Sequence, residues 1–85
     1  MNDLLFAPGP WRWAYVGHVA IEIFGEDGRC IASLSGDDEA NANLIAAAPA
    51  LYHALRDAYI AGNLPAELRI AALRALVLAE EGGDR

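Results

Sequence analysis

The amino-acid sequence predicts an α+β fold, in which an antiparallel β-hairpin or three-stranded sheet at about residues 11–34 precedes two or three helices packed on one face. The first observation is a change in the spacing of apolar residues, from every second residue to the 3.6-residue period of a helix. The second is the position of glycine and proline residues, which separate the predicted elements. The chain has 85 residues, of which 55% are hydrophobic, and this suits one small domain.

We therefore expect a single domain over residues 1–85. Residues 1–10 are predicted to be a loose lead-in, because Pro8-Gly9-Pro10 can continue neither a helix nor a ladder of strands. Residues 82–85 are predicted to be a frayed polar tail.

Alternating residues predict the strands. Trp11, Trp13 and Tyr15 share one face of a first strand, which Gly17 ends. Gly25-Glu26-Asp27-Gly28 predicts a hairpin turn, because glycine and aspartate tolerate positive φ. An even-length turn places one set of residues on a common buried face, which includes Val19, Ile21, Ile23, Cys30, Ala32 and Leu34.

Two or three helices are expected, at about 38–48, 49–61 and 65–81. Ser35, Asp37 and Asp38 are each suitable N-caps for the first. Pro49 favours a break and restart over a kink, because proline fits the first turn of a new helix. The apolar stripe predicted for these helices contains Ala40, Leu44, Ala48, Leu51 or Tyr52, Leu55 and Tyr59.

The last predicted helix is apolar on more than one side, whereas a surface helix of a monomer normally has a single apolar face. Its second face either packs on the preceding helix or meets another chain. The residues that we expect at such an oligomer interface are Leu73, Leu76 and Val77.

The charge, the cysteine content and the apolar runs count against several kinds of partner and site. The formal net charge is −6, and an acidic chain repels phosphate backbones, so direct nucleic-acid binding is not favoured. With one cysteine, no intramolecular disulfide and no cysteine-based metal cluster can form. The N-terminus lacks the pattern of a signal peptide, and no apolar run is long enough to span a membrane. We expect a soluble protein in the cytoplasm.

The sequence does not favour an enzyme. His18 and His53 are the candidate general bases, and Asp57 could orient His53 from one helical turn away. Cys30 could be a nucleophile, but the predicted register buries its thiol, where it would be inert. Asp37-Asp38-Glu39 suits a helix N-terminus better than a metal site, and no catalytic residue, cofactor or metal is predicted.

The segment Glu39–Leu55 closely resembles a motif of small tailed-phage and prophage proteins, in which a tryptophan-containing β region and a glycine turn precede "ANA-x-LIAAAP-x-LL-x-AL". The resemblance covers about Gly9 to Asp57, with Tyr52 in place of the second leucine, and Leu64–Arg85 lies outside it. It implies a phage or prophage origin and strands followed by a helix. It carries no catalytic residue to this chain.

The leading hypothesis is a non-enzymatic phage or prophage protein that binds a host protein in the bacterial cytoplasm. By analogy of size, charge and origin, the target would be a basic defence effector such as a CRISPR–Cas complex. Carboxylates would pair with its basic residues and aromatic rings would anchor the contact. The residues expected to bind this partner are Trp11, Trp13, Tyr15, Glu26, Asp27, Asp37, Asp38 and Glu39.

Two alternatives remain. The protein could be a homo-oligomeric structural or accessory phage protein, with a homodimer formed through the last helix. Less favoured is a nucleic-acid-binding regulator whose aromatic strand stacks on bases, because such sites also need a positive groove.

Overall fold

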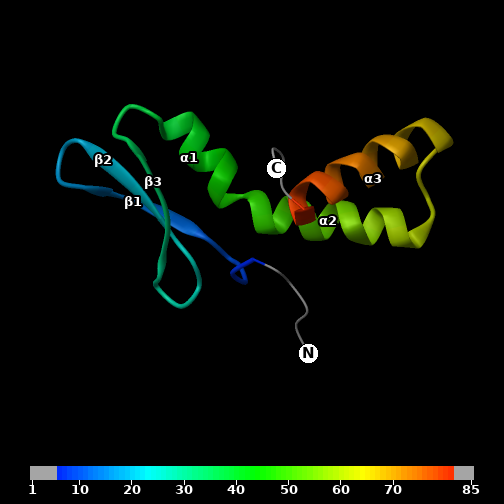
Figure 1. The fold of residues 1–85 in the computed structure, drawn as a ribbon, viewed down its shortest axis with the longest axis horizontal. Coiled ribbons are helices and arrows are strands. Elements are labelled where there is room, and N and C mark those ends of the chain that lie inside the picture. The colour runs from blue at the N-terminus through cyan, green and yellow to red at the C-terminus, as the bar shows by residue number, and fades with distance from the viewer. Residues whose placement is uncertain (1–5, 82–85) are drawn as a thin grey trace. The chain divides into compact units, whose positions relative to one another are not determined.

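A computed structural model describes residues 6–81 of the chain. The elements are β1 (Arg12–Val16), β2 (Ala20–Phe24), β3 (Cys30–Ser35), α1 (Glu39–Ala46), α2 (Ala48–Ala61) and α3 (Ala66–Glu81). The strands form one antiparallel sheet in the order β1-β2-β3 (Figure 1). This confirms the predicted α+β class, with three strands followed by three helices.

Contacts within the chain divide it after Ala50 into two units. The first unit contains the sheet, α1 and the first turn of α2. The second contains the rest of α2 and α3. The predicted tail at 82–85 and the first half of the predicted lead-in lie outside the described residues.

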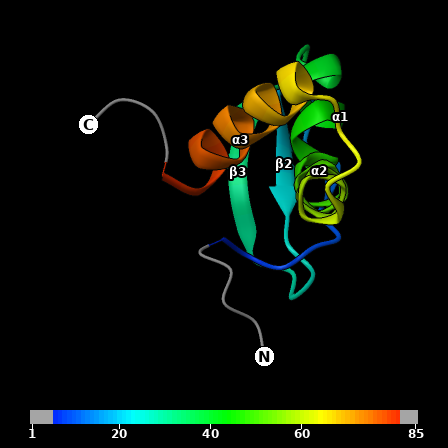
Figure 2. The same cartoon turned by 90° about the vertical axis from the view of Figure 1, so that its right-hand side faces the viewer.

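The buried face of the sheet centres on β2. Ile21 and Ile23 are fully buried, and they pair with Leu34 and Ala32 of β3. Helix α1 contacts β1 and β2, and its Ala42 is also fully buried. Figure 2 shows α1 alongside β2. An alanine at this position allows the helix backbone to approach the sheet closely.

The register between β2 and β3 differs from the prediction. Phe24 pairs with Cys30, so Arg29 belongs to the loop, and the pairing shifts between Ile23 and Phe24 so that Ile31 is an extra residue on β3. A bulge of one residue moves the following side chain to the other face. Cys30 is consequently exposed, and the prediction that its thiol is buried was wrong.

Two other residues that were predicted to lie on buried apolar faces are exposed. Val19 lies in the β1–β2 turn with 79% of its surface exposed, because β2 begins only at Ala20. Leu44 is 62% exposed, because α1 turns Ala42 to the sheet and not the predicted stripe through Ala40 and Leu44.

Pro49 separates two helices, as predicted. Helix α1 ends at Ala46, Ala47 forms a turn, and α2 begins at Ala48 with Pro49 in its first turn. The missing N–H of proline costs nothing there, since the first turn of a helix has no partner for it. Pro49 is buried, and its Cβ would lie 2.8 Å from a Cβ added to Gly9.

The described residues of the predicted lead-in contact Trp11. The Trp11 indole donates a hydrogen bond to the carbonyl of Ala7 at 3.0 Å. The ring of Phe6 meets the Trp11 ring edge to face, with 6.2 Å between the centroids. Gly9, with no side chain, leaves room for Pro49.

A hydrogen bond from β1 fixes the position of α1. The Trp13 indole nitrogen donates to the side-chain oxygen of Asn43 at 2.9 Å, across the edge of the buried face. Trp13 pairs with Ile23 and therefore shares the face that α1 covers. The indole is half-buried, so the tryptophan belongs to the packing of this unit.

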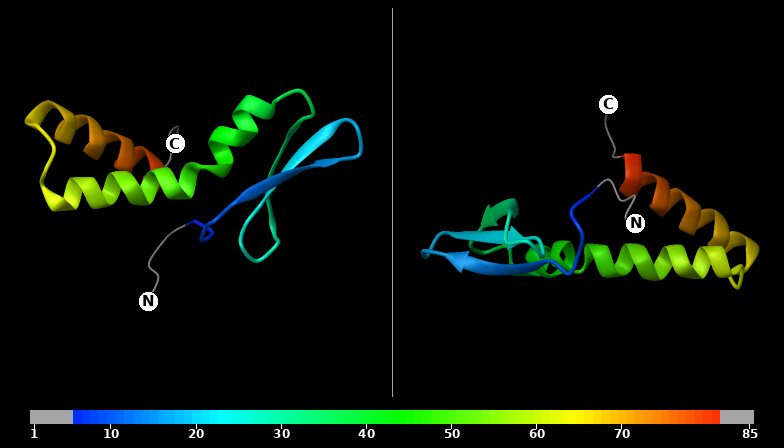
Figure 3. Two further views of the ribbon diagram at one scale, coloured as in Figure 1. Left: turned by 180° about the vertical axis from the view of Figure 1, so that it is seen from behind. Right: turned by 90° about the horizontal axis from the view of Figure 1, so that it is seen from below.

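In the second unit, α2 and α3 run back along each other and are joined by residues 62–65 (Figure 3). Gly62 ends α2 with φ of 74°, a left-handed conformation that favours glycine, and its N–H donates to the Tyr59 carbonyl. Pro65 precedes α3, as predicted, and its carbonyl accepts the N–H of Arg69. No helix within residues 6–81 is long and apolar enough to cross a membrane.

We expect Asn43→Ala to lower the free energy of unfolding by about 1 kcal/mol relative to Asn41→Ala, because it removes the acceptor of the Trp13 indole. Asn41→Ala is the matched control. It makes the same substitution in the same helix, so the change in helix propensity cancels, and Asn41 makes only an exposed contact to Asp38 at 3.4 Å. Urea denaturation of both variants measures the difference. Equal stabilities would show that the indole hydrogen bond contributes nothing.

Candidate protein-binding surface

Side-chain contacts join α3 to α2. The Tyr52 hydroxyl donates a hydrogen bond to the carboxylate of Glu80. The guanidinium of Arg69 lies over the Tyr59 ring, 5.3 Å from its centroid. Both contacts join an aromatic residue of α2 to a charged residue of α3, one near each end of the pair of helices.

One side of α3 therefore faces α2. Arg69, Ala72, Leu76 and Glu80 are spaced three or four residues apart, which places them on the same side of a helix. The two outer residues contact α2, and the two between them are buried.

The adjacent side of α3 is apolar and exposed. Ala66, Ile70, Leu73 and Val77 follow one another at intervals of four, three and four residues, and we call these residues the α3 stripe. The exposed fractions are 56% for Ile70, 46% for Leu73 and 42% for Val77. An open apolar depression of about 460 Å³ runs past Leu73 and Val77, and Arg74 and Leu78 also line it.

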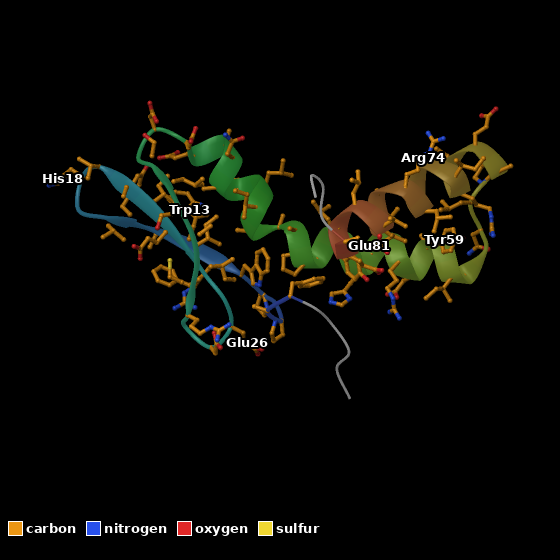
Figure 4. All side chains as sticks on the ribbon, viewed as in Figure 1. Trp13, His18, Glu26, Tyr59, Arg74 and Glu81 are labelled. Atoms are coloured by element: carbon orange, nitrogen blue, oxygen red, sulfur yellow. The ribbon has the colours of Figure 1, made fainter. Side chains whose placement is uncertain are left out.

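Charged residues border the α3 stripe on the side away from α2. Glu67, Arg74 and Glu81 are spaced by seven residues, so they lie along one edge of the stripe with alternating sign. All three are exposed, and Figure 4 shows Arg74 and Glu81 on α3.

Two of the three residues predicted at an oligomer interface lie on this stripe. Leu73 and Val77 are exposed, but Leu76 is only 7% exposed and lies on the side that faces α2. Ile70 is the exposed residue that the prediction missed. Its spacing from Leu73 and Val77 is the signal that could have identified it.

The aromatic residues predicted to bind a partner are partly used within the fold. Trp11 and Trp13 are half-buried and donate the hydrogen bonds described above. Tyr15 meets the Trp13 ring edge to face at 5.3 Å between centroids, and it is half exposed. Among these three rings, Tyr15 offers the largest accessible surface.

The acidic residues predicted to bind a partner form two groups. Glu26 and Asp27 lie in the β2–β3 loop, whereas Asp37, Asp38 and Glu39 lie between β3 and the start of α1. Strand β3 separates the groups, so they occupy opposite ends of the sheet. Figure 4 shows Glu26 at one end of the sheet and His18 at the other. The Gly36 N–H donates a hydrogen bond to the Val19 carbonyl, which places the β3–α1 connection at the same end as His18.

Several of these carboxylates make local hydrogen bonds. Asp27 accepts the backbone N–H of Arg29 at 3.0 Å, and Asp37 accepts the Ser35 hydroxyl at 2.7 Å. Asp38 occupies the N-cap position of α1, but its side chain makes no capping hydrogen bond there. Of the three suggested N-caps, Asp38 is therefore the one at the N-cap position, but its side chain does not cap the helix.

In the first unit, the two residues considered for catalysis lie apart. His18 is exposed in the β1–β2 turn, and Cys30 begins β3 at the other end of the sheet, with its Sγ 3.5 Å from the Ala32 carbonyl oxygen. In the second unit, His53 meets the Tyr52 ring edge to face at 5.5 Å. Within residues 6–81, no cluster of three histidine, cysteine or acidic residues could hold a metal ion.

The contact with Glu80 changes the titration of Tyr52. The hydrogen bond to the Glu80 carboxylate, followed by burial of the phenol and the negative charge of Glu80, raises the pKa of Tyr52 above its ordinary value of 10.0. Each of these effects favours the neutral phenol.

A protein-family model matches the chain. The family model described as Salmonella phage P22 protein Y8K6 matches residues 1–81, which is nearly the whole chain, so the chain belongs to this phage protein family. The match includes α3, whereas the resemblance found in the sequence was expected to end near Asp57. No curated protein and no solved structure matches.

We expect the Tyr52→Phe substitution to remove a tyrosine whose pKa lies above 10.0 from an ultraviolet titration of the folded protein. The hydrogen bond favours the neutral phenol in the folded state. Its stabilising effect is therefore complete below pH 10.0 and is lost as the pH rises through the raised pKa.

The difference in stability between wild type and Tyr52→Phe should accordingly decrease with pH above 10.0. Tyr59→Phe serves as the control, because its ring can still lie under Arg69. A wild-type titration with every tyrosine at or below pH 10.0 would contradict the assigned contact.

Proposed function

We propose that this member of the Salmonella phage P22 protein Y8K6 family is non-enzymatic and acts by protein–protein contact. The exposed α3 stripe supports this proposal most directly. Large apolar side chains that are contiguous on one helix and exposed to water are typical of surfaces that bind another protein. Leu78, which lines the same depression as Leu73 and Val77, is also more than half exposed.

The proposal includes the class of target, a basic host defence effector such as a CRISPR–Cas complex. Its support is the phage family, the small size and the net charge of −6. The exposed carboxylates at the two ends of the sheet would contact separate basic regions of the target. Tyr15 would supply the apolar contact between them, because it is the accessible ring of β1.

The non-enzymatic part of the proposal is supported by the placement of reactive groups in the first unit. His18 and Cys30 lie at opposite ends of the sheet, so the imidazole and the thiol cannot act together. Nucleophilic catalysis needs the base within hydrogen-bonding reach of the nucleophile.

Affinity capture from the host, followed by binding measurements with the purified captured protein, tests this function. We expect the wild-type protein to bind one host protein, and binding to weaken as salt increases. Replacing Asp37 and Asp38 by asparagine should weaken binding roughly tenfold at low salt and reduce its salt dependence. Glu22→Gln is the control, because Glu22 lies within the sheet on β2.

Two results would contradict the proposed function. One is that no captured host protein binds the wild-type protein directly at low salt. The other is that a purified target binds equally well to the wild type and to the asparagine variant at every salt concentration, which would exclude the acidic contact.

A further inference from the structure

We infer that the α3 stripe binds the α3 stripe of a second copy of this chain, with the two helices antiparallel. The inference rests on the proposed function, protein–protein contact, and it specifies one partner. Three features of α3 support it: the spacing of the stripe, the charged residues beside the stripe, and the side of the helix that α2 does not cover.

The spacing of the stripe is that of a coiled coil. Intervals of four and three residues place Ala66, Ile70, Leu73 and Val77 at the a and d positions of successive heptads, where apolar side chains pack between two helices. The residues on one flank of the stripe, Arg69, Leu76 and Glu80, are on the side that faces α2. The other flank is open to a partner.

The charges on the open flank favour a second copy. When two helices pair antiparallel about a two-fold axis, the open flank of one copy faces the open flank of the other. Pairing Ile70 of one copy with Leu73 of the other then brings Glu67 of each copy near Arg74 of the other, offset by about 3 Å along the axis. Two Glu–Arg pairs form for each dimer, and no other chain is needed to supply them.

The same register fits the sizes of the apolar side chains. Val77 of one copy lies across from Ala66 of the other, so a larger residue meets a smaller one at each end of the contact. Ile70 and Leu73 form the two central layers. The apolar area available on one half-exposed helix face is small, so we expect a dissociation constant in the micromolar range.

A charge-swap cycle on the purified full-length protein tests the inference. Sedimentation equilibrium should show a monomer–dimer equilibrium for the wild type. Glu67→Arg and Arg74→Glu should each weaken dimerisation by about tenfold, because each places like charges together across the axis. The double variant, Glu67→Arg with Arg74→Glu, should restore the wild-type dissociation constant to within about threefold.

Restoration is specific to self-pairing, because both swapped residues belong to one chain and only a second copy would carry the complementary change. Within a single helix, residues seven apart do not contact each other directly. Arg29→Glu is the control for net charge, because Arg29 lies in the β2–β3 loop of the first unit and carries the same change. Leu73→Glu should abolish dimerisation, and circular dichroism should show that each variant remains folded.

A wild-type protein that stays monomeric at high concentration would overturn the inference. So would a dimer that the single variants do not weaken, or one that the double variant fails to restore, since either result assigns the stripe to a different occupant. These measurements use the purified protein alone. Failure to find a host target would therefore leave this result unchanged, and a monomer would leave the proposed binding of a host protein untouched.

Discussion

Helix α3 has two apolar sides, and α2 covers only one of them. The buried side contributes Ala72 and Leu76, and the two contacts from Tyr52 and Tyr59 hold it against α2. A pair of helices cannot cover the α3 stripe as well, because a single neighbour contacts one side of a helix. The exposed stripe is thus a direct consequence of the composition of this helix, and the proposed contacts with other proteins depend on it.

The first unit shows how a small, alanine-rich chain forms a core. Ile21 and Ile23 are buried under α1, where Ala42 allows close approach and the Trp13–Asn43 hydrogen bond fixes the helix position. The aromatic strand is consequently needed for packing, and only part of its surface is available to a partner. A role in binding therefore falls mainly to Tyr15 and to the carboxylates at the two ends of the sheet.

The sequence was sufficient to predict the elements, and it failed where tertiary contacts decide between similar alternatives. Alternation of apolar residues and the glycine-rich turn predicted the strands, and Pro49 predicted the break between helices. The turn signal could not show that Arg29 joins the loop, so Cys30 was assigned to the wrong face. In α1, leucine appeared to be the better core residue than alanine, but a helix packed closely on a sheet favours the smaller side chain.

The candidate surface was predicted in part for the same reason. Excess apolar residues in the last helix indicated an exposed face, but the sequence could not distinguish the side that meets α2. The contacts of Arg69 and Glu80 with α2 make that distinction, and they assign Leu76 to the buried side and Ile70 to the exposed one. The acidic residues, considered together in the sequence, are separated by the length of β3.

The concentration dependence of thermal unfolding tests most directly whether a second copy of the chain covers the α3 stripe. If two copies cover it, association stabilises the folded chain, and the melting temperature of the purified protein should rise as its concentration is raised from micromolar to millimolar. A melting temperature that stays constant over this range would contradict the account, because the stripe would then contribute nothing to stability through a second copy.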